Sequence, residues 1–149
     1  SRRALYLHFD NLDEVFARGL ERRSSEVLAA WPTPPLGTTT AERVDWFAAS
    51  WSELLEELGP LCTSATQFEV AGGVGTALNR LRTWMRAAVE SVFQPELDRV
   101  SPEGRRRLVR ALHYTTSYTA WGDLRRHGAD AAEATGAMTA LLTALFATR

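Results

Sequence analysis

Two adjacent arginines near the start of the chain are the residues best suited to recognition chemistry. Arg2 and Arg3 follow Ser1, and the first nine residues contain no acidic side chain. If Ser1 caps a short helix, both arginines lie near its positive end, where the helix dipole disfavours a cation. This position indicates that they face an anion. Arginine is also the side chain best matched to guanine in the DNA major groove, where paired donors reach O6 and N7.

The same short helix would place its other side chains on two faces. Leu5 and Phe9 are spaced to point inward, whereas Tyr6 and His8 stay accessible beside the arginines. One interpretation is a solvated terminus whose aromatic rings pack near the following helix. The other is the second helix of a helix-turn-helix, whose N-terminal residues contact base edges.

The residues of this segment carry a family resemblance. The pattern Ser1-x-x-Ala4-Leu5-Tyr6-x-His8-Phe9, followed by DNLDEVF at 10–16, resembles the recognition helix and the next helix of TetR-family transcriptional regulators. Near the other end, Ser117-x-x-x-Trp121-Gly122-x-Leu124-Arg125, then Gly128 and an apolar helix, looks like the end of such a regulator's ligand-binding domain.

The resemblance implies a set of DNA contacts made by the opening segment: Ser1, Arg2, Arg3, Tyr6 and His8. It also implies that two helices preceding Ser1 are absent from this chain, so that the chain alone is expected to bind DNA poorly. Two positions depart from the family pattern. Ala4 stands where threonine is usual, and Leu12 stands where a phosphate-contacting lysine is usual.

The periodicity of apolar residues is helical along almost the whole chain, which predicts an all-α fold, a bundle of antiparallel helices joined by short loops. In the first half of the chain, the pattern predicts a helix from Asp10 to about Trp31, a proline-rich connection over 32–40, and a helix from Thr39 to about Leu58 that Gly59 and Pro60 end. A shorter helix over 61–70, a loop over 71–75 and a helix over 76–93 are expected next. The last two predicted helices run from Ser101 to about His127, where Gly128 ends the helix, and from a start at Asp130 and Glu133. Residues 1–31 are expected to be a remnant of the DNA-binding domain, and residues 32–149 a ligand-binding and dimerisation domain.

Aromatic and soft side chains recur on several of these helices. Most are expected to be ordinary core, but bundles also place ligand sites between facing helices, with aromatic walls and a few polar groups. The predicted pocket for a small apolar or aromatic effector uses Phe47, Trp51, Cys62, Phe68, Trp84, Met85, Tyr114 and Tyr118. As the only cysteine, Cys62 is interpreted either as a small buried apolar residue or as a thiol that lines this pocket.

The last two predicted helices have a second possible task. The resemblance implies a two-fold homodimer built as a four-helix interface; the alternative is an internal face of the bundle. The predicted interface residues are Trp121, Leu124, Met138, Leu142, Leu145 and Phe146.

Composition narrows the classes of function. The net charge is -1, no apolar run reaches the roughly 18 residues of a membrane span, and no signal-peptide pattern occurs, so a cytoplasmic location is expected. A single cysteine excludes an internal disulfide and any multi-cysteine zinc site. The three histidines lie at unrelated spacings, and neither H-E-x-x-H nor G-x-S-x-G is present. We therefore expect no enzyme, metal or cofactor.

The sequence accordingly favours a ligand-responsive DNA-binding transcriptional regulator, expected to be a repressor, that a small effector releases from a palindromic operator. The alternative is an all-helical interaction or small-molecule-binding module without a DNA-binding role.

Overall fold

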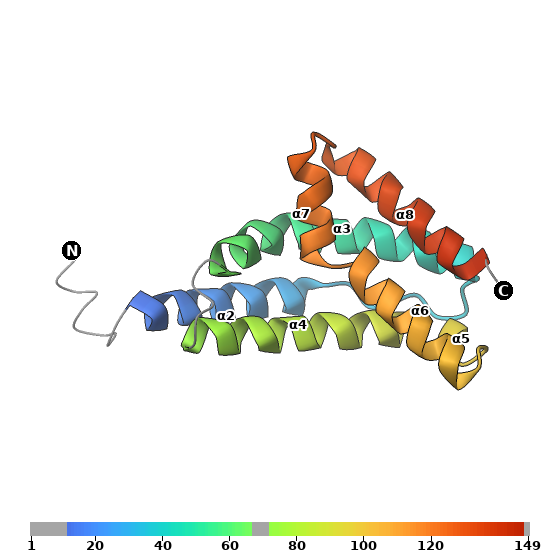
Figure 1. Cartoon of the computed structure of the whole chain (residues 1–149), viewed down its shortest axis with the longest axis horizontal. Helices are drawn as coiled ribbons and strands as arrows, with labels where there is room; N and C mark the ends of the chain where they lie inside the picture. Colours follow the sequence, from blue (N-terminus) through green and yellow to red (C-terminus); the bar gives the residue numbers. More distant parts are fainter. Residues whose placement is uncertain (1–11, 67–71, 148–149) are drawn as a thin grey trace.

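The computed structural model describes residues 12–66 and 72–147. Every regular element in these ranges is a helix, which confirms the all-α prediction (Figure 1). The helices are α2 (Leu12–Ala30), α3 (Thr40–Thr66), α4 (Gly73–Val92), α5 (Gln94–Leu97), α6 (Pro102–Thr115), α7 (Tyr118–Arg126) and α8 (Ala131–Ala147). None of these helices is long and apolar enough to cross a membrane.

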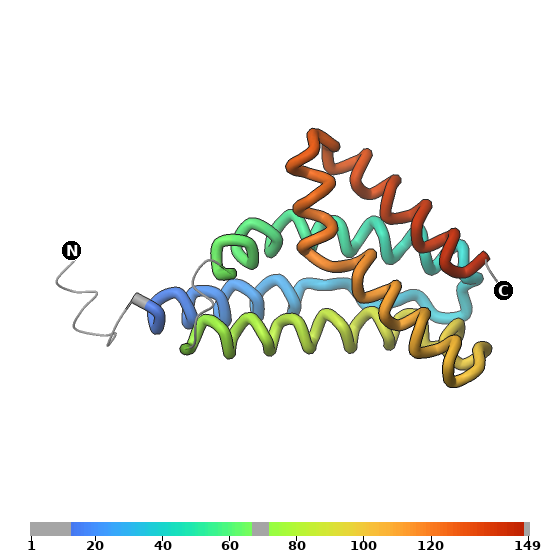
Figure 2. Tube along the Cα trace, in the orientation of Figure 1, coloured from blue at the N-terminus to red at the C-terminus, as the bar shows by residue number. Residues whose placement is uncertain are grey.

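Helix α3 is the centre of the bundle. It packs against α2 and α4 on one side and against α7 and α8 on the other. The tube in Figure 2 shows α2 and α4 side by side along the long axis, with α8 crossing α3 obliquely. Because α3 returns the chain in the opposite direction, α2 and α4 run parallel to each other and begin at the same end of the molecule.

Stacked aromatic rings fill the core between α2, α3 and α4. The Phe47 and Trp51 rings stack with centroids 4.9 Å apart, and the rings of Trp51 and Trp84 are parallel within 5° at 6.3 Å. Trp31 extends the cluster from the end of α2, with its ring 5.4 Å from Trp51. Such pairs add to the hydrophobic stabilisation by about 0.5–1.5 kcal/mol each.

Both predicted capping boxes form. The Glu42 carboxylate accepts a hydrogen bond from the backbone N–H of Thr39 at 2.8 Å, while the Thr39 hydroxyl accepts from the N–H of Glu42 at 3.3 Å. These bonds from Thr39 hold the pKa of Glu42 below its ordinary value. Asp130 and Glu133 make the same reciprocal pair at the start of α8, both at 2.8 Å.

The predicted end of α3 at Gly59 and Pro60 is wrong. The helix continues through both residues to Thr66, so the separate helix expected over 61–70 is, as far as residue 66, the last part of α3. Proline removes one helical hydrogen bond, but burial of Cys62 and Ala65 beyond it stabilises the continuation. Gly59 is buried beneath the Trp121 ring, where a Cβ would make ordinary contact at 4.0 Å.

The single helix predicted from Ser101 to His127 is also wrong. It divides into α6 and α7 at Thr116 and Ser117. The Thr116 carbonyl accepts a hydrogen bond from Trp51 Nε1 at 2.8 Å, and the Ser117 hydroxyl caps α7 by accepting from the N–H of Ala120 at 3.1 Å. The break therefore combines a local cap at Ser117 with a contact from Trp51, 65 residues away, that the local pattern does not contain.

Candidate functional site

A cavity lies between α4, the buried face of α3 and the junction of α6 with α7. Its volume is about 170 Å³. Trp51, Met85 and Val89 form an apolar floor, all three nearly fully buried. The complete lining is Trp51, Arg82, Met85, Arg86, Val89, His113, Thr116, Ser117, Tyr118 and Thr119.

The walls of this cavity are positively charged. Two arginines from successive turns of α4 face it, and no aspartate or glutamate is among the lining residues. Arg82 is held in place by the Tyr118 hydroxyl, which accepts from its Nη2 at 2.6 Å and its Nε at 3.1 Å. Arg86 is exposed at the rim and makes no hydrogen bond or ion pair with the described residues. The cavity therefore offers one fixed and one available guanidinium group.

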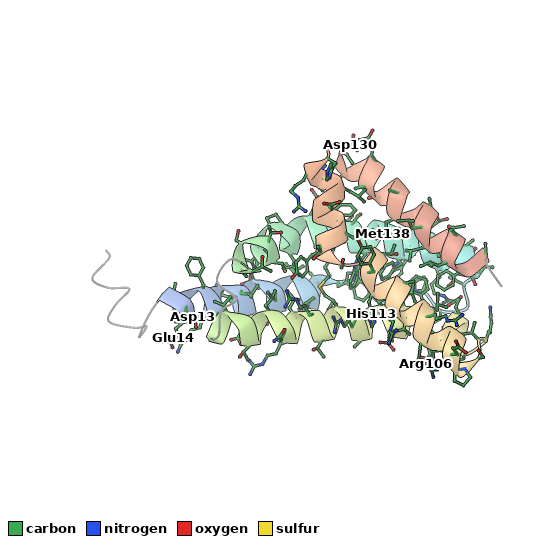
Figure 3. All side chains as sticks on the ribbon, viewed as in Figure 1. Asp13, Glu14, Arg106, His113, Asp130 and Met138 are labelled. Atoms are coloured by element: carbon green, nitrogen blue, oxygen red, sulfur yellow. The ribbon has the colours of Figure 1, made fainter. Side chains whose placement is uncertain are left out.

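Helices α6 and α7 complete the wall opposite α4. His113 comes from α6 (Figure 3), and its Nε2 lies 3.1 Å from Oε1 of Glu90, although not in the alignment of a hydrogen bond. Ser117 and Thr119 come from the start of α7. The dipole of α7 therefore adds positive potential at the same wall.

Three of the residues predicted for the pocket line this cavity: Trp51, Met85 and Tyr118. Cys62 is fully buried and lies outside the lining, as its interpretation as a small apolar residue predicts. Burial raises the pKa of its thiol to about 11, although the Arg82 guanidinium lowers it in part.

Other residues predicted for the pocket lie elsewhere. Phe47 is fully buried in the aromatic core, and Trp84 packs against Trp31 and Trp51 on the side of α4 that faces α2. The prediction for Tyr114 needs correction, because its side chain is 75% exposed on the solvent face of α6 and does not line the cavity. Phe68 lies outside the described residues.

Sequence reasoning missed the charged part of the site, namely Arg82, Arg86 and His113. The two arginines are four residues apart, on the same side of α4 as Met85 and Val89. Residues at i and i+4 lie on one helix face, so two arginines at this spacing beside apolar residues could have indicated a charged wall of the pocket.

The predicted DNA-contacting residues lie outside the described ranges: Ser1, Arg2, Arg3, Tyr6 and His8. The helix that follows them is firmly attached to the bundle, however. At its start, Asp13 accepts hydrogen bonds from the N–H groups of Gly73 at 2.7 Å and Val74 at 3.4 Å, the first turn of α4. Asp13 is labelled in Figure 3 where the two helices begin.

Two further features tighten this attachment of α2 to α4. A Cβ built on Gly73 would lie 3.0 Å from the Ala17 Cβ, so a larger residue there would have to move the helices apart by a few tenths of an ångström. Glu21 also forms an ion pair with Arg80 of α4 at 2.7 Å. The cavity helix and the helix that follows the opening segment therefore share one junction.

The predicted dimer residues divide into two groups. Three of them are buried within the single chain, as expected if they form an internal face of the bundle: Trp121, Met138 and Leu142. Leu124, Leu145 and Phe146 are half-buried against the core.

A buried ion pair was not anticipated either. Glu96 of α5 is fully buried, and its Oε1 accepts from the Thr40 hydroxyl at 2.8 Å and from Arg43 Nε at 3.4 Å. Arg43 also donates to the Thr38 carbonyl at 3.0 Å. The pair joins α5 to the start of α3, and neither residue lines the cavity.

The described residues contain no cluster of three or more side chains suited to a metal ion. The chain matches no protein-family model, no curated protein and no solved structure.

Proposed function

We propose that the chain is part of a ligand-responsive DNA-binding transcriptional regulator of the TetR type, acting as a repressor. The resemblance of residues 1–16 supports the DNA-binding part of this proposal. The observation that carries the regulatory part is the junction at Asp13 and Gly73, because it ties α2, which follows the proposed recognition helix, to the helix that provides the cavity arginines.

In the proposed mechanism a ligand in the cavity changes the position of α4, and α2 follows because their first turns share Asp13. The recognition helix, directly before α2 in the sequence, then changes its position relative to the DNA. Thermodynamic linkage requires the ligand to prefer the non-binding arrangement by the factor by which it weakens DNA affinity, typically about 5- to 150-fold.

The proposed functional unit is a homodimer formed through α7 and α8. From Ala134 to the end of the described chain α8 carries no charged side chain, and Leu141 on its outer face is 53% exposed. A two-fold dimer would present two recognition helices to successive major grooves, roughly 34–36 Å apart, and would require a palindromic operator.

The test is selection of bound duplexes from fragmented genomic DNA with the full-length gene product. We expect enrichment of a palindromic sequence, loss of that enrichment in the double variant Arg2→Ala and Arg3→Ala, and no loss in Arg106→Ala, which removes an exposed arginine of α6. Absence of any enriched sequence would overturn the DNA-binding role.

The alternative, a small-molecule-binding module without a DNA-binding role, is favoured by one observation. The cavity is lined entirely by residues from α3, α4, α6, α7 and the junction between α6 and α7, and needs nothing from the opening segment. Ligand binding together with a failed DNA selection would identify this alternative.

A further inference from the structure

We infer that the ligand of the cavity is a small organic anion, a single ring bearing one carboxylate. This inference rests on the proposed ligand-responsive function and specifies the chemical class of the effector. It adds a negative charge to the expected apolar or aromatic effector, because the walls of the cavity are cationic.

The cavity has room for about one ring beneath its opening to solvent. Its volume is about 170 Å³. An apolar protein cavity of about 150 Å³ holds one benzene molecule. A ring can lie on the floor formed by Trp51, Met85 and Val89, and the remaining volume accommodates one carboxylate.

The charge of the cavity selects the sign of the ligand. The lining contributes two guanidinium groups and no carboxylate. The single acid of α4, Glu90, lies one turn beyond Arg86 and outside the lining, and it already has two partners, His113 at 3.1 Å and Arg105 at 3.9 Å. A negatively charged ligand would therefore balance the positive charge of the cavity.

The charged residues that line a second cavity of the same protein are mainly acidic, so the positive charge is a feature of the cavity beside α4. The depression between the C-terminal part of α2 and the middle of α3 is lined by Glu26, Glu53 and Glu57 with one arginine, Arg23. That arginine is already paired with Glu57 and Glu26. Of these two cavities, only the one beside α4 leaves a cation available to a ligand.

The two arginines have different roles in the proposed complex. Arg82 is oriented by two hydrogen bonds to the Tyr118 hydroxyl and provides a fixed positive charge near the cavity floor. Arg86 stands one turn further along α4 at the rim, where its planar guanidinium can donate two parallel hydrogen bonds to a carboxylate. The start of α7 contributes its positive dipole end from the opposite wall.

The test is isothermal titration calorimetry of the chain with three probes of matched ring size: benzoate, benzamide and benzylammonium. We expect benzoate to bind, and benzamide to bind about tenfold more weakly, because its two hydrogen bonds to the guanidinium lack the charge assistance that makes such bonds roughly twice as strong. Benzylammonium should bind more weakly still, because the two guanidinium groups repel its positive charge. The Arg86→Gln variant should weaken benzoate about tenfold, which is the loss of one charged contact. Arg106→Gln, with the same charge change on the outside of α6, should leave benzoate affinity unchanged.

Arg86 is exposed and makes no hydrogen bond or ion pair with the described residues, so its replacement is not expected to disturb folding; circular dichroism checks this. Equal binding of benzoate and benzamide would overturn the inference and leave a ligand-binding cavity in place. Equal loss of benzoate affinity in Arg86→Gln and Arg106→Gln would also overturn it, because binding would then follow net charge alone. If none of the three probes binds at millimolar concentration, the anion class is wrong. The DNA selection described above then decides separately whether the regulator proposal stands.

Discussion

The junction between α2 and α4 is the part of the structure on which regulation is proposed to depend, and it can be tested by removing one carboxylate. In Asp13→Ala the N–H groups of Gly73 and Val74 lose their acceptor. Loss of a side-chain cap costs about 0.5–2 kcal/mol, and loss of a negative charge at a helix N-terminus costs about 0.3–1 kcal/mol. We therefore expect the free energy of unfolding to fall by about 1–3 kcal/mol.

The assay is equilibrium urea denaturation followed by circular dichroism. Asp13→Asn retains an acceptor but not the charge, and should lie between the wild type and Asp13→Ala. Asp45→Ala is the matched control, because Asp45 is an exposed acid of α3 that makes no side-chain hydrogen bond or ion pair with the described residues; it should change stability by no more than about 0.5 kcal/mol. If Asp13→Ala and Asp45→Ala have the same denaturation midpoint, the carboxylate does not hold the two helices together.

Three further predictions concern groups that the fold buries or caps. Glu96→Ala should destabilise the chain by about 3–5 kcal/mol, because it leaves Arg43 buried without its partner, and a loss below 1 kcal/mol by urea denaturation would contradict a buried pair. The pKa of Cys62 is raised from 9.0 to about 11, so the unfolded chain ionises first, and stability should decline by about 2 kcal/mol as the pH rises from 9 to 11. The difference between wild type and Cys62→Ala across that window isolates this effect, and a constant difference would refute it. Ser117→Ala should cost about 1 kcal/mol by removing the cap on Ala120, measured as a lower melting temperature; an unchanged temperature would show that the cap does not stabilise α7.

Most of the helices could be predicted from the sequence, because a capping or stop signal involves only a few neighbouring residues. The capping boxes at Thr39 and Asp130 reach only three residues along the chain, and both form. The prediction failed at Gly59 and Pro60 because burial beyond the proline outweighs the helix-breaking tendency of the pair. It failed at Thr116 because the acceptor for Trp51 Nε1 lies 65 residues away in sequence.

The cavity was predictable only in part for the same reason. Periodicity places Trp51, Met85 and Tyr118 on apolar helix faces, but it does not say which faces meet at a void and which form solid core. Phe47 has the same pattern and lies within the aromatic core. The charge of the site depends on Arg82, whose orientation is fixed by a hydroxyl 36 residues away.

The clearest test of the account as a whole is a titration of benzoate into the full-length gene product, once free and once bound to the duplex enriched by selection. If the cavity controls DNA binding through α4 and α2, benzoate should bind the DNA complex about 5- to 150-fold more weakly than the free protein. Equal affinities in the two titrations would mean that the cavity and the proposed recognition helix are not coupled.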